Sequence, residues 1–294
     1  MGNQFKTYFL MVALIAIITG FGAIVDSALG GNHVILFAFF LFSLISTWVT
    51  YWYADTIVLK MYRGKIVSRE EEPELHEIVE RLAANAHIPM PRIAIVPMAE
   101  PNAFATGRNP QHGLVACTTG ILNILDKQEL AGVLGHEIGH IKHRDTLLQT
   151  IAATLTGILG MLASVAKWGT IFGDNRNSNP IALVVMLIGA ILLPFVGMLI
   201  SMAISRSREY LADSAGAEFS RDPNSLARAL QKMENMATAS AQHGLKSNAI
   251  QGTEAMFIIN PFAGASLASL FSTHPPTEKR IARLQQMAMG RQVF

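Results

Sequence analysis

The chain has almost no cysteine and no strong excess of charge of either sign. Cys117 is the single cysteine among 294 residues, which excludes an internal disulfide framework and a zinc site built from thiolates. We interpret Cys117 as a small buried apolar residue. The formal net charge is only +2 at pH 7, and no basic run is interleaved with aromatic residues. Nucleic acid is therefore not expected as a partner.

Charge is nearly missing from two long stretches, residues 1–59 and 146–205. Their charged side chains are Lys6, Asp26, Asp55, Lys167, Asp174 and Arg176. Within these stretches, the uncharged apolar runs 8–25, 34–53 and 180–205 are long enough to cross a bilayer, and 146–166 is a weaker candidate. A cleaved signal peptide is the alternative for the first run. We predict four transmembrane helices.

The apolar runs divide the chain into membrane and soluble parts. Residues 1–59 are expected to form an N-terminal transmembrane hairpin, and 146–205 a second transmembrane pair with a short loop at 167–179. Residues 60–145 and 206–294 then form two parts of one soluble body. Basic residues follow the second run and predict, by the positive-inside rule, that the soluble body faces the cytoplasm: Lys60, Arg63, Lys65 and Arg69.

The soluble parts carry patterns of helix and, less often, of strand. Several helices are expected in the soluble parts. One begins near Pro73, one follows an Asp126–Glu129 capping box, one includes Leu226 to Met233, and one covers 278–289. Residues 92–96 are typical of a strand, and 102–107 with 113–118 of a hairpin. The small and polar residues 237–256 are expected to form a loop. The predicted fold class is α+β, mainly α, with a small β-sheet.

The helix after Asp126 contains the sequence His136-Glu137-Ile138-Gly139-His140. His136 and His140 are four residues apart, so on a helix both imidazoles project from one face and can hold one zinc ion per chain. Glu137 lies beside the first ligand, where its carboxylate can act as general base on a zinc-activated water. This is the H-E-x-x-H pattern of zinc metallohydrolases.

The third ligand has to come from elsewhere in the chain. Ligands at 136, 140 and 143 would span about 10 Å along a helix, too far for bonds near 2 Å to one ion, so His143 is a poor candidate. Proteases that use a third histidine nearby first turn the chain at a glycine, and here His143 and Thr146 occupy those two positions. A distant carboxylate is the alternative, and the candidates are Glu209, Glu218, Glu234, Glu254 and Glu278.

Glu209 is favoured because Asp213 lies one helical turn further along the chain. One carboxylate can then bind the metal while the other accepts the spare ring N–H of a ligating histidine. The alternative is that both are surface carboxylates of an amphipathic helix.

Three motifs together resemble the HtpX-type membrane zinc metalloproteases, which are bacterial relatives of the prenyl-protein (CAAX) endoprotease. They are the H-E-x-x-H motif, Glu209-x-x-x-Asp213 and Asn102-Ala103-Phe104-Ala105, and the resemblance runs over nearly the whole chain. It implies a gluzincin-like protease fold with zinc bound by His136, His140 and Glu209. It also implies a multi-pass protein of the bacterial plasma membrane with its protease domain in the cytoplasm. Degradation of unfolded or damaged membrane proteins under stress, and self-cleavage, are the expected activities.

A second donor to the developing oxyanion is expected beside the zinc. His274 and Arg280 are the candidates and match a His-Pro…Arg motif of the same family. Tyr210 could also donate, but a buried packing role beside Glu209 is favoured for it. The alternatives are a turn histidine before Pro275 and an arginine in a surface salt bridge.

Substrate is expected to bind extended, as an added strand. The candidate edge comprises Asn102, Ala103, Phe104 and Ala105, which precede the zinc helix. An ordinary core hairpin with Phe104 buried is the alternative.

Three other functions compete with this interpretation. A non-catalytic membrane protein with structural zinc would need a closed and usually cysteine-rich site, which this chain lacks. A carrier or channel tends to place ionisable groups at bilayer depth, whereas the apolar runs are uncharged. A prenyl-protein protease with an intramembrane chamber is the nearer alternative, although four spans are few to enclose one.

Overall fold

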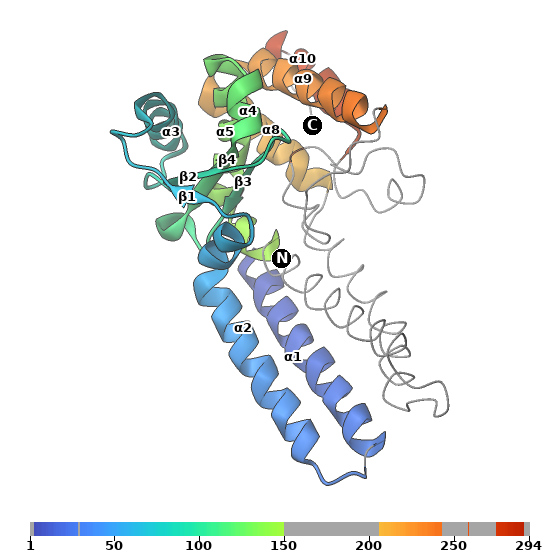
Figure 1. Cartoon of the computed structure of the whole chain (residues 1–294). Coiled ribbons are helices and arrows are strands. Elements are labelled where there is room, and N and C mark those ends of the chain that lie inside the picture. Colours follow the sequence, from blue (N-terminus) through green and yellow to red (C-terminus); the bar gives the residue numbers. More distant parts are fainter. Residues whose placement is uncertain (1–2, 29, 150–205, 243–257, 259–274, 291–294) are drawn as a thin grey trace.

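The computed structural model describes residues 3–28, 30–149, 206–242, 258 and 275–290. Figure 1 shows a pair of long helices, α1 and α2, extending from a body of shorter helices around a small sheet. The start of α1 and the end of α2 both lie at the end of this helix pair that meets the body.

Helices α1 (Asn3–Ala28) and α2 (Val34–Met61) form an antiparallel hairpin. Residues Thr7–Ser27 and Val34–Tyr53 within them are long and apolar enough to cross a membrane. Phe21 packs edge-on against Phe39 between the two helices, while many other large apolar side chains, such as Phe9 and Phe37, are exposed. The expected N-terminal hairpin therefore has the form of two candidate membrane helices. The expected second pair lies almost wholly outside the described residues, so it and the four-part division of the chain stay predictions.

Helix α2 joins the hairpin to the sheet. It is kinked at Tyr53, whose φ of −118° and ψ of 17° are not helical, at the end of the apolar run. Beyond the kink, Val58 and Leu59 are buried together with Tyr62 against the sheet residues Phe104 and Leu114. The apolar run and the body are therefore parts of one packed unit.

The sheet has four strands in the order β1-β2-β4-β3. They are β1 (Lys65–Ile66), β2 (Arg92–Val96), β3 (Ala103–Thr106) and β4 (Leu114–Thr118). Strands β3 and β4 are antiparallel and connected through the short 3-10 helix η1 (Pro110–His112), while β2 is parallel to β4. The expected hairpin is confirmed, and β3 is the end strand of this sheet.

The helices of the body pack on one another and on the sheet around a common apolar core. They are α3 (Pro73–Ala86), α4 (Thr119–Ile124), α5 (Lys127–His143), α8 (Arg206–Ser220), α9 (Pro223–Gln242) and α10 (Thr277–Ala288). The mainly α, α+β class is confirmed. The expectation of a loop from residue 237 was wrong for 237–242, because α9 continues to Gln242. The remainder of that loop lies outside the described residues.

Candidate metal centre

Helix α5 supplies the H-E-x-x-H motif from its buried C-terminal half. Its first turn is fixed by the expected capping box, in which the Asp126 side chain accepts from Gln128 and Glu129 and the Glu129 side chain accepts from the Asp126 N–H. His136, Glu137 and His140 are all at most 5% exposed.

Glycines allow α8 to pack unusually close to α5. A Cβ added to Gly216 would lie 2.9 Å from the backbone nitrogen of His136, and one added to Gly139 would lie 2.8 Å from the Cβ of Ala215. Neither position has room for a side chain without a shift of the helices. This close approach brings Glu209, in the first turn of α8, to the two histidines.

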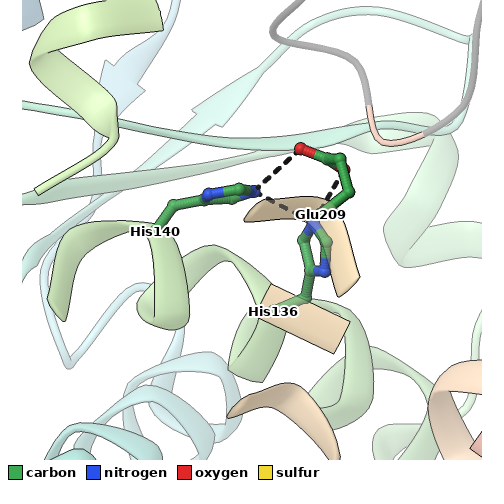
Figure 2. A group of neighbouring side chains, drawn as sticks. All are labelled: His136, His140 and Glu209. Carbon is green, nitrogen blue, oxygen red and sulfur yellow. Dashed lines mark hydrogen bonds and ion pairs between the residues drawn. The ribbon is translucent and has the colours of Figure 1, made fainter. Parts of the chain in front are cut away.

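Three donor atoms converge between the two helices (Figure 2). The Nε2 atoms of His136 and His140 are 3.2 Å apart. The Glu209 carboxylate lies 3.7 Å from the first and 3.5 Å from the second of these nitrogens. Four ligands at about 2.0–2.1 Å from a tetrahedral zinc ion lie about 3.3 Å from one another, so these spacings fit one metal ion. Among the described residues, the group that can hold a metal is His136, His140 and Glu209, and His143 is not part of it.

The hydrogen bonds of the two imidazoles also fit a cation. The Nδ1 atom of His136 lies 2.9 Å from Asp213, and that of His140 lies 3.3 Å from Asp145. Because each carboxylate accepts the ring N–H at Nδ1, each Nε2 presents a lone pair. Two lone pairs and a carboxylate that face one another in a buried space repel unless a positive charge lies between them.

Asp145 contacts His140 at the site, although no motif in the sequence marks it. It directly follows the end of α5, where Arg144 adopts the left-handed conformation and the Asp145 N–H donates to the His140 carbonyl. Its second oxygen accepts from Arg208 at 2.6 Å. Its partner Arg208 immediately precedes the favoured ligand Glu209 in the sequence. This neighbouring positive charge was the only feature that pointed to a further carboxylate near the site.

Asp213 lies beside the His136 ring, and Arg280 is its ion-pair partner. The Arg280 guanidinium donates to both Asp213 oxygens at 2.9 and 2.7 Å and to the Ile258 carbonyl at 2.8 Å. Arg280 is 1% exposed, so the alternative of a surface salt bridge was wrong. Burial disfavours the charged form of Asp213, but the Arg280 charge and the hydrogen bonds outweigh it and lower the pKa of Asp213 to about 2.

Arg280 therefore lies at the Nδ1 side of the His136 ring, 3.5 Å from that nitrogen. Arg280 therefore holds the Asp213 carboxylate in place, and the carboxylate in turn holds the orientation of the His136 ring. The expected role of Arg280 as oxyanion donor stays a prediction. His274, the other expected donor, lies outside the described residues. Tyr210 is partly exposed, and Arg283 stacks over its ring at 4.4 Å.

The ionisation of the site follows from burial and from the carboxylates. Burial lowers the pKa of His136 to about 4 and raises the pKa of Glu137 to about 8. For His140, burial is outweighed by the Asp145 hydrogen bond and by the charges of Glu209 and Glu137, which raise its pKa to about 9. The surroundings of His140 therefore favour positive charge, whether from a proton or from a metal ion.

The expected substrate edge lies directly beside Glu137. The ladder bond from the Thr118 N–H to the Asn102 carbonyl sets the alternation of β3, so the backbone groups of Ala103 and Ala105 point away from β4. A backbone hydrogen bond from Ala105 reaches the Glu137 carboxylate. In the described sheet β3 is the end strand, and Phe104 is buried next to Tyr62. Substrate binding at this edge stays a prediction.

Comparison with known proteins places this site in a family. Residues 69–288 match peptidase family M48. Three relatives described as "Protease HtpX homolog" match almost end to end. The relative from Syntrophobacter fumaroxidans is 47% identical over 98% of this chain and 100% of its own length. Those from Persephonella marina and Pyrococcus furiosus are 50% and 48% identical, over 94% and 98% of this chain and 96% and 97% of their own lengths.

The chain belongs to peptidase family M48 and is a membrane metalloprotease. The resemblance to HtpX-type proteases is confirmed. The crystal structure of S. mikatae Ste24p has a similar fold, with a TM-score of 0.50 and 17% identity over 96% of this chain and 65% of that chain. At this identity the likeness shows the fold alone.

Proposed function

We propose that the chain is an integral-membrane zinc endopeptidase that cleaves unfolded or damaged membrane proteins. The observation that carries this proposal is the convergence of two imidazole nitrogens and one carboxylate next to a fourth, non-ligating carboxylate, that of Glu137. Three protein donors leave a coordination position for the reaction, as in catalytic zinc sites, whereas structural zinc sites have four. This supports a catalytic over a structural metal.

Imidazole and carboxylate donors support zinc as the metal, bound once per chain by His136, His140 and Glu209. A zinc ion there supplies Lewis-acid chemistry, polarising the scissile carbonyl and lowering the pKa of water. Asp213 and Asp145 hold the two rings through their Nδ1 atoms and keep the Nε2 lone pairs directed at the ion. Arg280 and Arg208 hold these two carboxylates in turn.

Glu137 is the general base in this proposal. Its carboxylate takes the proton of the attacking water and passes it to the leaving nitrogen. Burial raises the pKa of Glu137 to about 8, so its carboxylate is a stronger proton acceptor than an ordinary one. The Ala105 backbone orients this carboxylate toward the edge of β3. His274 and Arg280 remain the proposed oxyanion donors.

Substrate pairs as an added strand with Asn102, Ala103, Phe104 and Ala105. The backbone groups of Ala103 and Ala105 face the side on which Glu137 lies, so a peptide paired there would present a carbonyl to the site. Backbone pairing does not depend on side-chain identity, which suits a protease acting on many unfolded sequences.

The proposed setting is a multi-pass protein of the cell membrane with the site on the cytoplasmic side. The basic residues beyond α2 support this orientation. The metal ligands on α5 and α8 lie on the two sides of residues 146–205, so that segment crosses the membrane an even number of times. We propose two crossings, which give four membrane helices in a gluzincin-like protease and place the site close to membrane-protein substrates.

The test is cleavage by the purified, detergent-solubilised full chain. An unfolded soluble protein, a destabilised membrane protein and a prenylated peptide are each incubated with wild type and with Glu209→Ala. Newly formed N-termini are identified by mass spectrometry and bound metal by elemental analysis. We expect zinc near one per chain and cleavage of both unfolded proteins by wild type alone. Cleavage of the prenylated peptide alone would establish the prenyl-protein protease instead.

A further inference from the structure

A polar cleft lies where the membrane hairpin meets the soluble body, and it shares no side chain with the metal-ligand group. Four segments form it: the first turns of α1, the C-terminal part of α2, the β3–η1 connection and the chain after α5. We call it the interfacial arginine cleft. Its polar lining comprises Thr7, Tyr8, Tyr51, Arg108, Asn109 and Arg144.

The cleft carries two positive charges that no carboxylate of the described residues balances. Arg108 lies over the Trp52 ring at 4.5 Å and contacts the His112 ring nitrogen at 2.6 Å, neither of which removes its charge. Among the described residues, neither Arg108 nor Arg144 takes part in an ion pair. The nearest acidic residue in sequence, Asp145, is already engaged by His140 and Arg208. Two guanidinium groups that line one cleft favour an anion with several acceptor oxygens, such as a phosphate. Each guanidinium can donate two hydrogen bonds to the oxygens of such an anion.

The position of the cleft along the hairpin indicates the source of the anion. The apolar spans begin at Thr7 in α1 and end at Tyr53 in α2, so the cleft lies at the depth of the lipid headgroups. Exposed aromatic side chains mark the same level, namely Tyr8, Trp48, Trp52 and Tyr53, as is typical of a membrane interface. The exposed apolar surface of α1 adjoins the cleft. A lipid whose phosphate is bound here can therefore lay an acyl chain along that surface.

The size of the cleft agrees with a phosphate group. Its volume is about 60 Å³, where roughly 10–15 Å³ on this scale holds one water. The space therefore fits a group of about five heavy atoms, and the remainder of a lipid would lie outside it. Leu147 closes the apolar side and packs with Leu10 of α1.

We propose that the interfacial arginine cleft binds the headgroup phosphate of an anionic phospholipid. Arg108 and Arg144 bind the phosphate oxygens, and the hydroxyls of Tyr8 and Tyr51 face the headgroup. This site does not depend on the proposed catalysis, because none of its side chains is a metal-ligand candidate, and Arg144 reaches His140 only through its backbone N–H.

The test is lipid binding by the full chain in detergent, measured by native mass spectrometry. Short-chain phosphatidylglycerol, short-chain phosphatidylcholine and inorganic phosphate are titrated separately, and phosphate is also added as a competitor. The cleft variant is Arg108→Gln/Arg144→Gln. The matched control, Lys60→Gln/Arg63→Gln, removes the same charge from exposed residues at the same end of α2 but outside the cleft.

We expect phosphatidylglycerol to bind more tightly than phosphatidylcholine. The cleft variant should bind phosphatidylglycerol at least about tenfold more weakly, since each basic residue contributes on the order of a few-fold in affinity or more, and the control should stay within about twofold. Equal weakening in both variants would show general attraction to positive charge and overturn the site. Displacement of the lipid by millimolar inorganic phosphate would assign the cleft to free phosphate instead.

A second measurement needs no variant. A phosphatidylglycerol analogue with a photoreactive headgroup is irradiated with the wild-type chain, and the labelled peptides are mapped. Labels at Tyr8, Tyr51, Arg108 or Arg144 support the cleft, and labels confined to other segments contradict it.

Discussion

Asp145 and Arg208 form a 2.6 Å ion pair that joins the end of α5 to the start of α8. Asp145 also holds His140, and Arg208 directly precedes Glu209. The pair therefore connects the histidine ligands on α5 with the carboxylate ligand on α8. In the sequence, these two helices lie on either side of residues 146–205. It is largely removed from solvent, since the Asp145 side chain is 2% exposed and that of Arg208 is 11% exposed.

Replacing Asp145 by Asn is expected to weaken metal binding. The carboxamide is a poorer acceptor for the Nδ1–H of His140, and loss of such a partner typically costs about 10–100-fold in metal affinity. Zinc competition against a chromogenic chelator measures this change. The control is Arg206→Gln, which alters an exposed residue of α8 without a described ion pair. Unchanged affinity in Asp145→Asn would show that the carboxylate only packs.

Replacing Arg280 by Met is expected to lower stability strongly. The change leaves the buried Asp213 carboxylate without its charged partner, and breaking a buried pair from one side costs about 3–5 kcal/mol. Thermal unfolding of the metal-free chain in detergent reports this loss. The double variant Arg280→Met/Asp213→Leu removes both charges and should recover part of the melting temperature. A double variant no more stable than Arg280→Met would contradict the ion-pair account.

Replacing Gly216 by Ala tests the close packing of α5 and α8. The added Cβ would lie 2.9 Å from the His136 nitrogen and 3.1 Å from the Gly132 carbonyl, so α8 must move and carry Glu209 with it. We expect a loss of about 1–3 kcal/mol in stability together with weaker zinc binding. Gly20→Ala is the control, because its Cβ meets no atom within 4 Å among the described residues. Full zinc affinity in Gly216→Ala would show that the spacing of these helices does not set the site.

Removal of the metal is expected to destabilise the wild-type chain. The ion ties α5 to α8, and a ligand that binds only the folded state stabilises it by mass action. A chelator should therefore lower the melting temperature of wild type by several degrees and leave that of Glu209→Ala unchanged. An equal shift in both proteins would place the relevant metal elsewhere.

Patterns in the sequence predicted those parts of the structure that depend on interactions between residues close together in the chain. The strand at 92–96, the Asp126 capping box and the shared face of His136 and His140 each depend on neighbouring residues, and all are present in the structure. The partner of His140 and the burial of Arg280 depend on which distant helices meet. Asp145 contacts Arg208 across 63 positions of sequence, and Arg280 contacts Asp213 across 67. The chemistry of a metal ion pointed to Glu209 over a similar separation, but no such requirement pairs Asp145 with Arg208 or Asp213 with Arg280, so these contacts required the three-dimensional fold.

The most direct measurement compares wild type with Glu137→Gln in the degradation of an unfolded test protein, with bound zinc determined in both. Glu137 lies beside the metal donors but is not one of them. The account therefore predicts that the variant keeps the same zinc content and loses cleavage. A variant that keeps its zinc and cleaves at the wild-type rate would show that Glu137 is not the base and would contradict the account.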